Sequence, residues 1–115
     1  MTEIDIPAAM EKAADFIEIE GHFGKGHFKT DEGCFCTLGA YAVALGVDPS
    51  FERLDDALRE RGVMGAFDEG WRRLDETARA LGYDVVHQMN DAPETTATDM
   101  AGVLRETAAQ LRSVG

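Results

Sequence analysis

Apolar side chains recur at intervals of three and four residues along most of the chain, which is the spacing of one face of an α-helix. Such stripes lie between Asp5 and Gly21, from Phe51 to Arg61, from Phe67 to Leu81 and from Met100 to Leu111. Polar and charged residues separate the apolar positions, so each stripe predicts an amphipathic helix with one buried face. Asp5 can cap the first helix and Pro7 fits its first turn. A glycine follows each of the first three stripes and is expected to end the helix.

Residues 34–46 have no polar stripe. Almost every residue in this segment is apolar or small, and Gly46 can end it. A helix without a polar face is surrounded by protein. Gly39 and Ala40 predict a close crossing with another helix, because a glycine inside a helix costs about 1 kcal/mol relative to alanine. The predicted fold is therefore mainly α, a compact bundle of about five helices around a central apolar helix at about 34–46.

Two segments between these helices have a less definite pattern. Residues 21–33 hold four glycines and two histidines, which indicates a loop, with a short β-hairpin around Gly24–Gly26 as an alternative. Residues 84–90 begin with a potential helix cap, Asp84, but the two valines that follow leave helix and strand both open.

The last part of the chain carries two local signals. Thr96–Asp99 resembles a capping box, with Asp in place of the usual Glu, and predicts the start of the last helix. Asn90 and Asp91 stand just before Pro93 and are interpreted as an Asx turn. In a second structural role, Asp91 could accept hydrogen bonds from amides at the N-terminus of a neighbouring helix, such as the one near Cys34.

The chain is strongly acidic. Twenty-two Asp and Glu against eleven Lys and Arg leave a formal charge of −11. This charge repels nucleic-acid phosphates and anionic lipid headgroups, so direct nucleic-acid or membrane binding is not expected. It suits docking on a partner protein with a basic surface, for which Asp55, Asp56 and Glu60 are the candidate contacts. A narrower alternative is mimicry of DNA by two rows of acids, which arginines interrupt: Asp48, Glu52, Asp55, Asp56 and Glu60, then Asp68, Glu69, Asp75 and Glu76.

The length of the chain is that of one domain. Splitting 115 residues would leave two pieces too small to bury a core, so residues 1–115 are expected to form a single helical domain. No apolar run approaches the roughly 20 residues needed to span a bilayer, and the N-terminus shows no secretion signal. Two cysteines one residue apart are poorly placed to form a disulfide with each other, which fits a reducing cytoplasm.

Two histidines and both cysteines fall close together in the sequence, at His22, His27, Cys34 and Cys36. These are residue types that bind zinc. The Cys-x-Cys pair is tighter than the spacing of familiar structural zinc sites, and Cys36 is expected to point into the core from the apolar helix. Buried cysteines and solvated histidines are therefore preferred to a metal site, and no cofactor is expected.

A cysteine nucleophile is the other chemical interpretation. Cys36 lies near the predicted N-terminus of a helix, where the macrodipole lowers the pKa of a thiol. His27 or His87 could act as the base, and Asp91 or Asn90 could orient the imidazole. Nothing in the sequence shows that these side chains meet, so structural roles are preferred to catalysis.

Three segments resemble a known family of small proteins of unknown function, found in actinobacteria and their phages. "CFCTLGAYAVAL" is similar to the C-x-L-G-A segment of that family, "MNDAPETTATDMAGVLRETA" to its distal Asn-Asp segment, and "AADFIEIEGHFGKG" to its first helix and aromatic loop. The matching positions that the resemblance marks as a structural motif are Cys36, Leu38, Gly39, Ala40, Asn90 and Asp91. The family commonly has tryptophan where this chain has His22 and Met89, which counts against His22 as a metal ligand. The resemblance implies a phage or prophage-like setting and no particular activity.

The expected function is protein–protein binding by a small acidic intracellular helical protein. A phage or prophage accessory factor that modulates a host protein is one form of this hypothesis, and it would act in the host cytoplasm. The alternative from another class is a cysteine- or zinc-dependent enzyme centred on Cys36, His27, His87 and Asp91. A homodimer formed through exposed aromatic faces of the helices is a third option.

Overall fold

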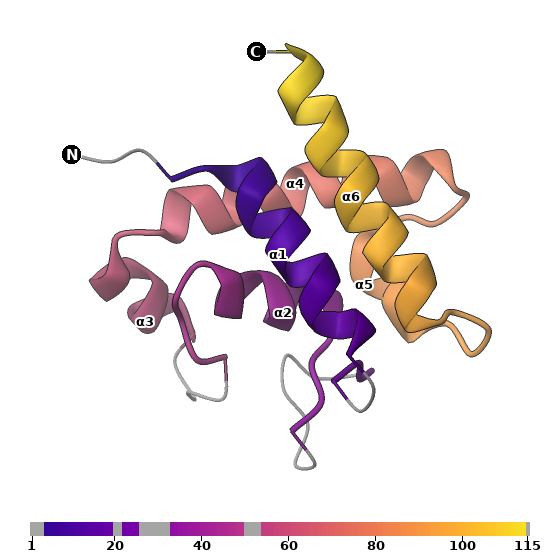
Figure 1. The fold of residues 1–115 in the computed structure, drawn as a ribbon, viewed down its shortest axis with the longest axis horizontal. Coiled ribbons are helices and arrows are strands. Elements are labelled where there is room, and N and C mark those ends of the chain that lie inside the picture. The colour runs from indigo at the N-terminus through magenta and orange to yellow at the C-terminus, as the bar shows by residue number, and fades with distance from the viewer. Residues whose placement is uncertain (1–3, 20–21, 26–32, 50–53, 115) are drawn as a thin grey trace.

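The helical prediction is confirmed by a computed structural model of the chain, which describes residues 4–19, 22–25, 33–49 and 54–114 (Figure 1). Within these ranges the structure contains six helices: α1 (Ile6–Glu18), α2 (Thr37–Ala44), α3 (Leu54–Arg61), α4 (Met64–Ala80), α5 (Val86–Asp91) and α6 (Ala97–Val114). They pack into a compact all-α globule, and the described ranges contain no strand. The hairpin considered around Gly24–Gly26 lies partly outside the described residues. The nearest β feature is one parallel bridge between Phe23 and Phe35.

The helices α1 and α6 run side by side across one face of the molecule (Figure 1). Each begins as its local sequence predicts. The Asp5 carboxylate accepts a hydrogen bond from the Ala8 amide at 2.9 Å. Thr96 and Asp99 form a reciprocal capping box, with contacts of 3.0 and 3.2 Å, so an aspartate can replace the usual glutamate here.

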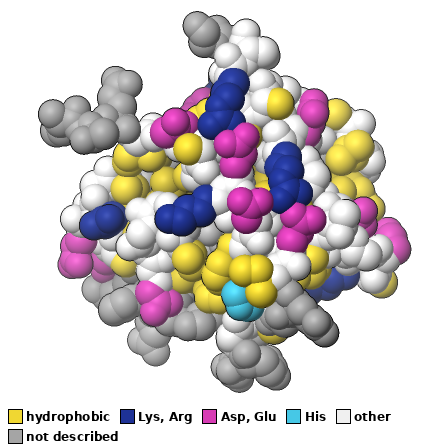
Figure 2. Space-filling view, in the orientation of Figure 1, with side chains coloured by type: hydrophobic (Ala, Val, Ile, Leu, Met, Phe, Trp, Pro, Cys, Tyr) yellow, Lys and Arg dark blue, Asp and Glu magenta, His cyan; other side chains and the backbone are white. Residues whose placement is uncertain are grey.

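Ion pairs join the outer edges of α1 and α6. Arg105 of α6 contacts Asp15 at 2.8 Å and also Glu18, while Arg112 contacts Glu11 at 2.5 Å. Basic and acidic side chains accordingly intermix over this face (Figure 2). Beneath the pairs, the apolar stripe of α1 is fully buried, as its spacing predicts.

Helix α2 is the central helix, as expected, and it contacts α1, α4, α5 and α6. Every residue from Thr37 to Ala42 is buried. The helix is shorter than the predicted 34–46, because the chain before Thr37 is extended. The Phe35 N–H donates to the His22 carbonyl at 2.5 Å, and the Phe35 carbonyl accepts from the Gly24 N–H at 2.7 Å. These backbone groups therefore pair with the preceding loop and not within a helix.

Tyr41 of α2 packs directly against Gly70 of α4, a contact that no signal in the sequence indicates. A Cβ placed on Gly70 would lie 2.2 Å from Tyr41 Oη and 2.4 Å from Tyr41 Cε2. The phenol also donates to the Ala66 carbonyl at 2.7 Å, and its ring stacks on Phe67. The crossing predicted at Gly39 stays a prediction.

Helices α3 and α5 are short and depend on their neighbours. Helix α3 lies at the edge of the molecule against α4, with Leu58 as its one fully buried residue within the described part. Residues 86–91 are helical, which settles the alternative left open by the two valines. The proposed cap at Asp84 is wrong: the Asp75 carboxylate of α4 accepts from the Val86 amide at 2.8 Å instead. Across the described ranges, none of the helices has the length and apolarity that a bilayer span requires.

Candidate functional site

The thiol of Cys36 is buried, with the residue 7% exposed, as expected. Its position differs from the prediction in one respect, because Cys36 is the N-cap of α2 and not part of the helix. Its Sγ accepts a hydrogen bond from the Gly39 amide at 3.3 Å. Burial raises the pKa of this thiol, the negative charge of Asp91 raises it further, and backbone hydrogen bonds oppose both effects only in part. The group is therefore held as a neutral thiol, which is the weaker nucleophile.

Asn90 is the residue that joins the two motif segments. Its Oδ1 accepts hydrogen bonds from the Thr37 amide at 2.9 Å and the Thr37 hydroxyl at 2.7 Å. Its Nδ2 donates to the Gly24 carbonyl at 3.1 Å and to the Asp91 carboxylate at 3.0 Å. Because Asn90 is 1% exposed, its polar groups can be satisfied only by the protein around it.

The Asx-turn interpretation of Asn90 and Asp91 is wrong, since both residues lie in the last turn of α5. The sequence suggested that Asp91 could cap a neighbouring helix. In the structure it is Asn90 whose side chain accepts a hydrogen bond from the first amide of α2. No local spacing reveals this contact, because 53 residues separate Asn90 from Thr37. The apolar residues around Asn90 are a weak sequence signal of this contact, because a polar side chain between buried positions needs a hydrogen-bond partner.

The histidines do not assemble a site with Cys36 in the described part of the chain. His22 Nδ1 lies 3.1 Å from the Phe16 carbonyl, and its ring packs on the Phe16 ring. His87 is exposed on α5. His27 lies outside the described residues. Among the residues that the structure does describe, no three His, Cys, Asp or Glu side chains are grouped so that they could hold a metal ion.

Three carboxylates converge beside α3. Asp56 and Glu60, one helical turn apart, line a hollow of about 510 Å³ together with Asp48 from the connection after α2. Val47 and Ala57 supply apolar surface in the same hollow, and Arg61 also lines it. The third predicted contact, Asp55, is exposed on α3 but does not line this hollow. The structure thus groups two of the three predicted residues and adds one from elsewhere in the acidic row.

The second row of acids, on α4, is largely engaged within the protein. Arg72 and Arg73 both bind Glu69, and hydrogen bonds from Arg72 first and Arg73 second hold the pKa of Glu69 below its ordinary value. Arg72 and Arg73 also contact Glu76. The Asp75 carboxylate caps α5. These contacts engage three of the four acids of this row.

A family model described as "Family of unknown function (DUF6197)" matches residues 1–110. The chain belongs to the DUF6197 family. No curated protein and no solved structure matches the chain. The matched range of DUF6197 includes both segments joined by Asn90, so the contact between α2 and α5 lies within the family's shared region.

Proposed function

We propose that this DUF6197 protein acts by binding another protein, with a Lys or Arg side chain of the partner entering the hollow beside α3. The observation that carries the proposal is the convergence of Asp48, Asp56 and Glu60 around the apolar surface of Val47 and Ala57. A long basic side chain can lay its methylene stem on apolar surface and direct its charge to carboxylates. The hollow therefore suits a basic side chain on a protein surface.

The charge of the whole chain supports the same proposal. A formal charge of −11 attracts a basic surface from a distance and speeds the encounter. The peripheral position of α3 leaves its outer face accessible (Figure 1). The family resemblance supports a phage or prophage-like origin in actinobacteria, so the proposed partner is a host protein in the host cytoplasm.

Mimicry of DNA is supported less well than the binding of one basic side chain in the hollow beside α3. A mimic needs regularly spaced carboxylates that remain available to a basic groove. Glu69 and Glu76 are bound by arginines and Asp75 caps a helix, which interrupts the second row.

The test is capture of partners from an actinobacterial lysate, compared between the wild type and the double substitution Asp56→Asn with Glu60→Gln. We expect a partner that binds the wild type at low salt and is lost by the double variant, with affinity reduced at least about tenfold. The matched control is Asp68→Asn with Glu106→Gln, which removes the same charge from exposed sites elsewhere. Equal capture by all three proteins, unchanged at high salt, would contradict the proposal.

A further inference from the structure

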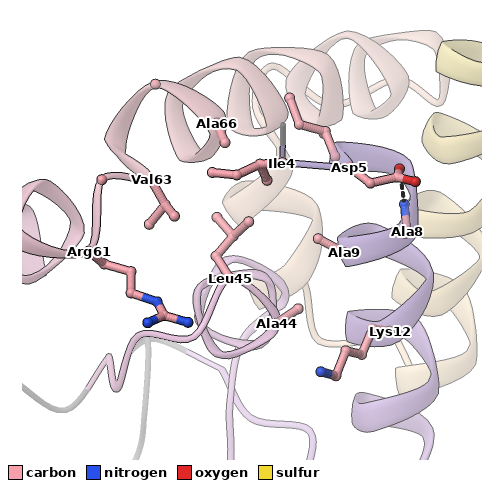
Figure 3. A pocket seen from close by; sticks show the side chains of 13 residues that line it. Ile4, Asp5, Ala8, Ala9, Lys12, Ala44, Leu45, Arg61, Val63 and Ala66 are labelled. Atoms are coloured by element: carbon pink, nitrogen blue, oxygen red, sulfur yellow. Dashed lines mark hydrogen bonds between the residues drawn. The ribbon is translucent and has the colours of Figure 1, made fainter. Parts of the chain in front are cut away.

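A second hollow, of about 960 Å³, lies where the start of α1, the ends of α2 and α3 and the start of α4 meet (Figure 3). Its apolar lining includes Ile4, Leu45 and Val63. Figure 3 shows Arg61 on one side and Lys12 on the other, with Leu45 and Ala44 between them. Ile4 is 40% exposed, which is unusual for a large apolar side chain in this structure. The hollow therefore combines apolar surface with a cation at each side.

Lys12 and Arg61 differ from the other described cations in having no partner. Each of the other Lys and Arg residues in the described ranges binds a carboxylate or a main-chain carbonyl: Lys25, Arg59, Arg72, Arg73, Arg79, Arg105 and Arg112. The carboxylate that borders the hollow, Asp5, accepts from the Ala8 amide. In a chain with twice as many acids as bases, two unpaired cations beside the same apolar surface indicate a site for external carboxylates.

The Arg61 side chain lies beside the backbone of Gly46. Gly46 ends the turn after α2 at φ +89°, and a Cβ built there would lie 2.8 Å from Arg61 Nε. Glycine thus allows the guanidinium group to lie against the main chain at the edge of the hollow.

We infer that this hollow docks a segment of a partner protein in which apolar side chains are flanked by Asp or Glu. The apolar side chains occupy the surface around Leu45 and Val63, and the carboxylates pair with Lys12 and Arg61. A second copy of this chain fits less well, because two molecules of charge −11 repel each other. The inference rests on the proposed function in that the occupant is a protein. Arg61 lines both hollows, but Lys12, Leu45 and Val63 line only this one, so a change at Lys12 tests this surface alone.

The test is selection of binders from a displayed library of random short peptides against the wild-type protein. We expect enriched peptides in which leucine-like residues alternate with Asp or Glu. A synthetic copy of an enriched peptide should shift the amide NMR signals of Leu45 and Ala66, and its affinity should fall on the order of tenfold in Lys12→Glu. Ile4→Ser should weaken it severalfold, since part of the apolar contact is lost.

Two matched controls accompany these variants. Arg59→Glu makes a comparable charge change on α3 outside this hollow, and Ile19→Ser removes another exposed isoleucine, 53% exposed. Both should bind the peptide like the wild type. The inference is overturned if no peptide is enriched, if enriched peptides carry Lys or Arg, or if Lys12→Glu binds them unchanged.

Other occupants give other results. Binding of dodecanoate at this hollow without peptide enrichment would assign it to a small amphiphile, and a Lys12-dependent dimer in light scattering would assign it to a second copy. Either result overturns the peptide assignment. Equal capture of lysate partners by the wild type and the Asp56→Asn, Glu60→Gln variant contradicts the proposed function and leaves the peptide result unaffected, so the two failures are distinguishable.

Discussion

At the scale of single residues, Asn90 shows how one side chain can organise several segments. Its amide oxygen satisfies the first amide of α2, and its nitrogen holds the loop at Gly24. A buried amide with all of these contacts stabilises the fold, whereas removing it leaves the Thr37 amide and hydroxyl without a partner. The buried thiol of Cys36 caps the same turn through the Gly39 amide. The start of α2 is therefore held by side chains from two parts of the chain.

Asn90→Ala tests this role. We expect the free energy of unfolding to fall by about 1–3 kcal/mol, because buried groups lose their hydrogen bonds and α2 loses a cap. Urea denaturation followed by circular dichroism measures the change. His87→Ala is the control on the same helix, where an exposed side chain is removed and a change within about 0.5 kcal/mol is expected. Equal unfolding midpoints for the two variants would contradict the capping role.

At the scale of secondary-structure elements, the contact between α2 and α4 depends on the absence of a side chain at Gly70. The Tyr41 ring occupies the space that a Cβ would fill. A glycine here lowers the intrinsic stability of α4, yet it lets a fully buried tyrosine pack against the helix and bond to Ala66. Tertiary packing decides this position against helix propensity.

Gly70→Ala and Gly102→Ala should change stability in opposite directions. In Gly70→Ala the new methyl group collides with Tyr41, and overpacking of this kind costs about 1–3 kcal/mol. At Gly102, inside α6, a Cβ would meet open space, so alanine should raise the free energy of unfolding by about 0.5–1 kcal/mol. Thermal and urea unfolding of both variants measure the two effects. A stabilised Gly70→Ala protein would show that the crossing is looser than the structure indicates.

At the scale of the whole molecule, acidic charge and ion pairing have opposite effects on stability. Twenty-two carboxylates are held on a globule with a radius of gyration of 13.0 Å, so their mutual repulsion is greater in the folded than in the unfolded chain. Against this, Arg105 and Arg112 join α1 to α6 through exposed pairs, which contribute little because solvent and salt screen them. We expect the repulsion to be the larger effect.

Added salt should therefore raise the melting temperature. Raising NaCl from about 0.01 M to about 0.15 M shortens the Debye length from about 30 Å to about 8 Å, which screens repulsion across the molecule. Calorimetry over this range measures the shift. The Asp56→Asn, Glu60→Gln variant carries two fewer negative charges and should show a smaller rise. A melting temperature that falls with salt would show that the ion pairs between α1 and α6 outweigh the repulsion.

The features that were predictable from the sequence depend on residues close together in the chain. The apolar stripes identified the helices, because the 3.6-residue period places those side chains on one face. The capping signals at Asp5 and Thr96 were confirmed, since such contacts span three residues. The burial of Cys36 followed from its apolar surroundings in the sequence.

The candidate sites depend on contacts between distant residues and were only partly predictable. Asp56 and Glu60 share a face because they are four residues apart, but Asp48 joins them through the turn that follows α2. The hollow that holds Lys12 and Arg61 has no signal in the sequence, because its walls come from four helices.

The sequence by itself determined the helical class, the amphipathic faces, the apolar character of the central helix and the acidic surface, because each follows from residue type and local spacing. Only the tertiary structure decided where α2 begins, which residue caps α5, how close α2 and α4 approach, and which charges remain unpaired. Those features arise when packing brings together groups far apart in the chain, and a hydrogen bond or a steric contact then overrides the local preference.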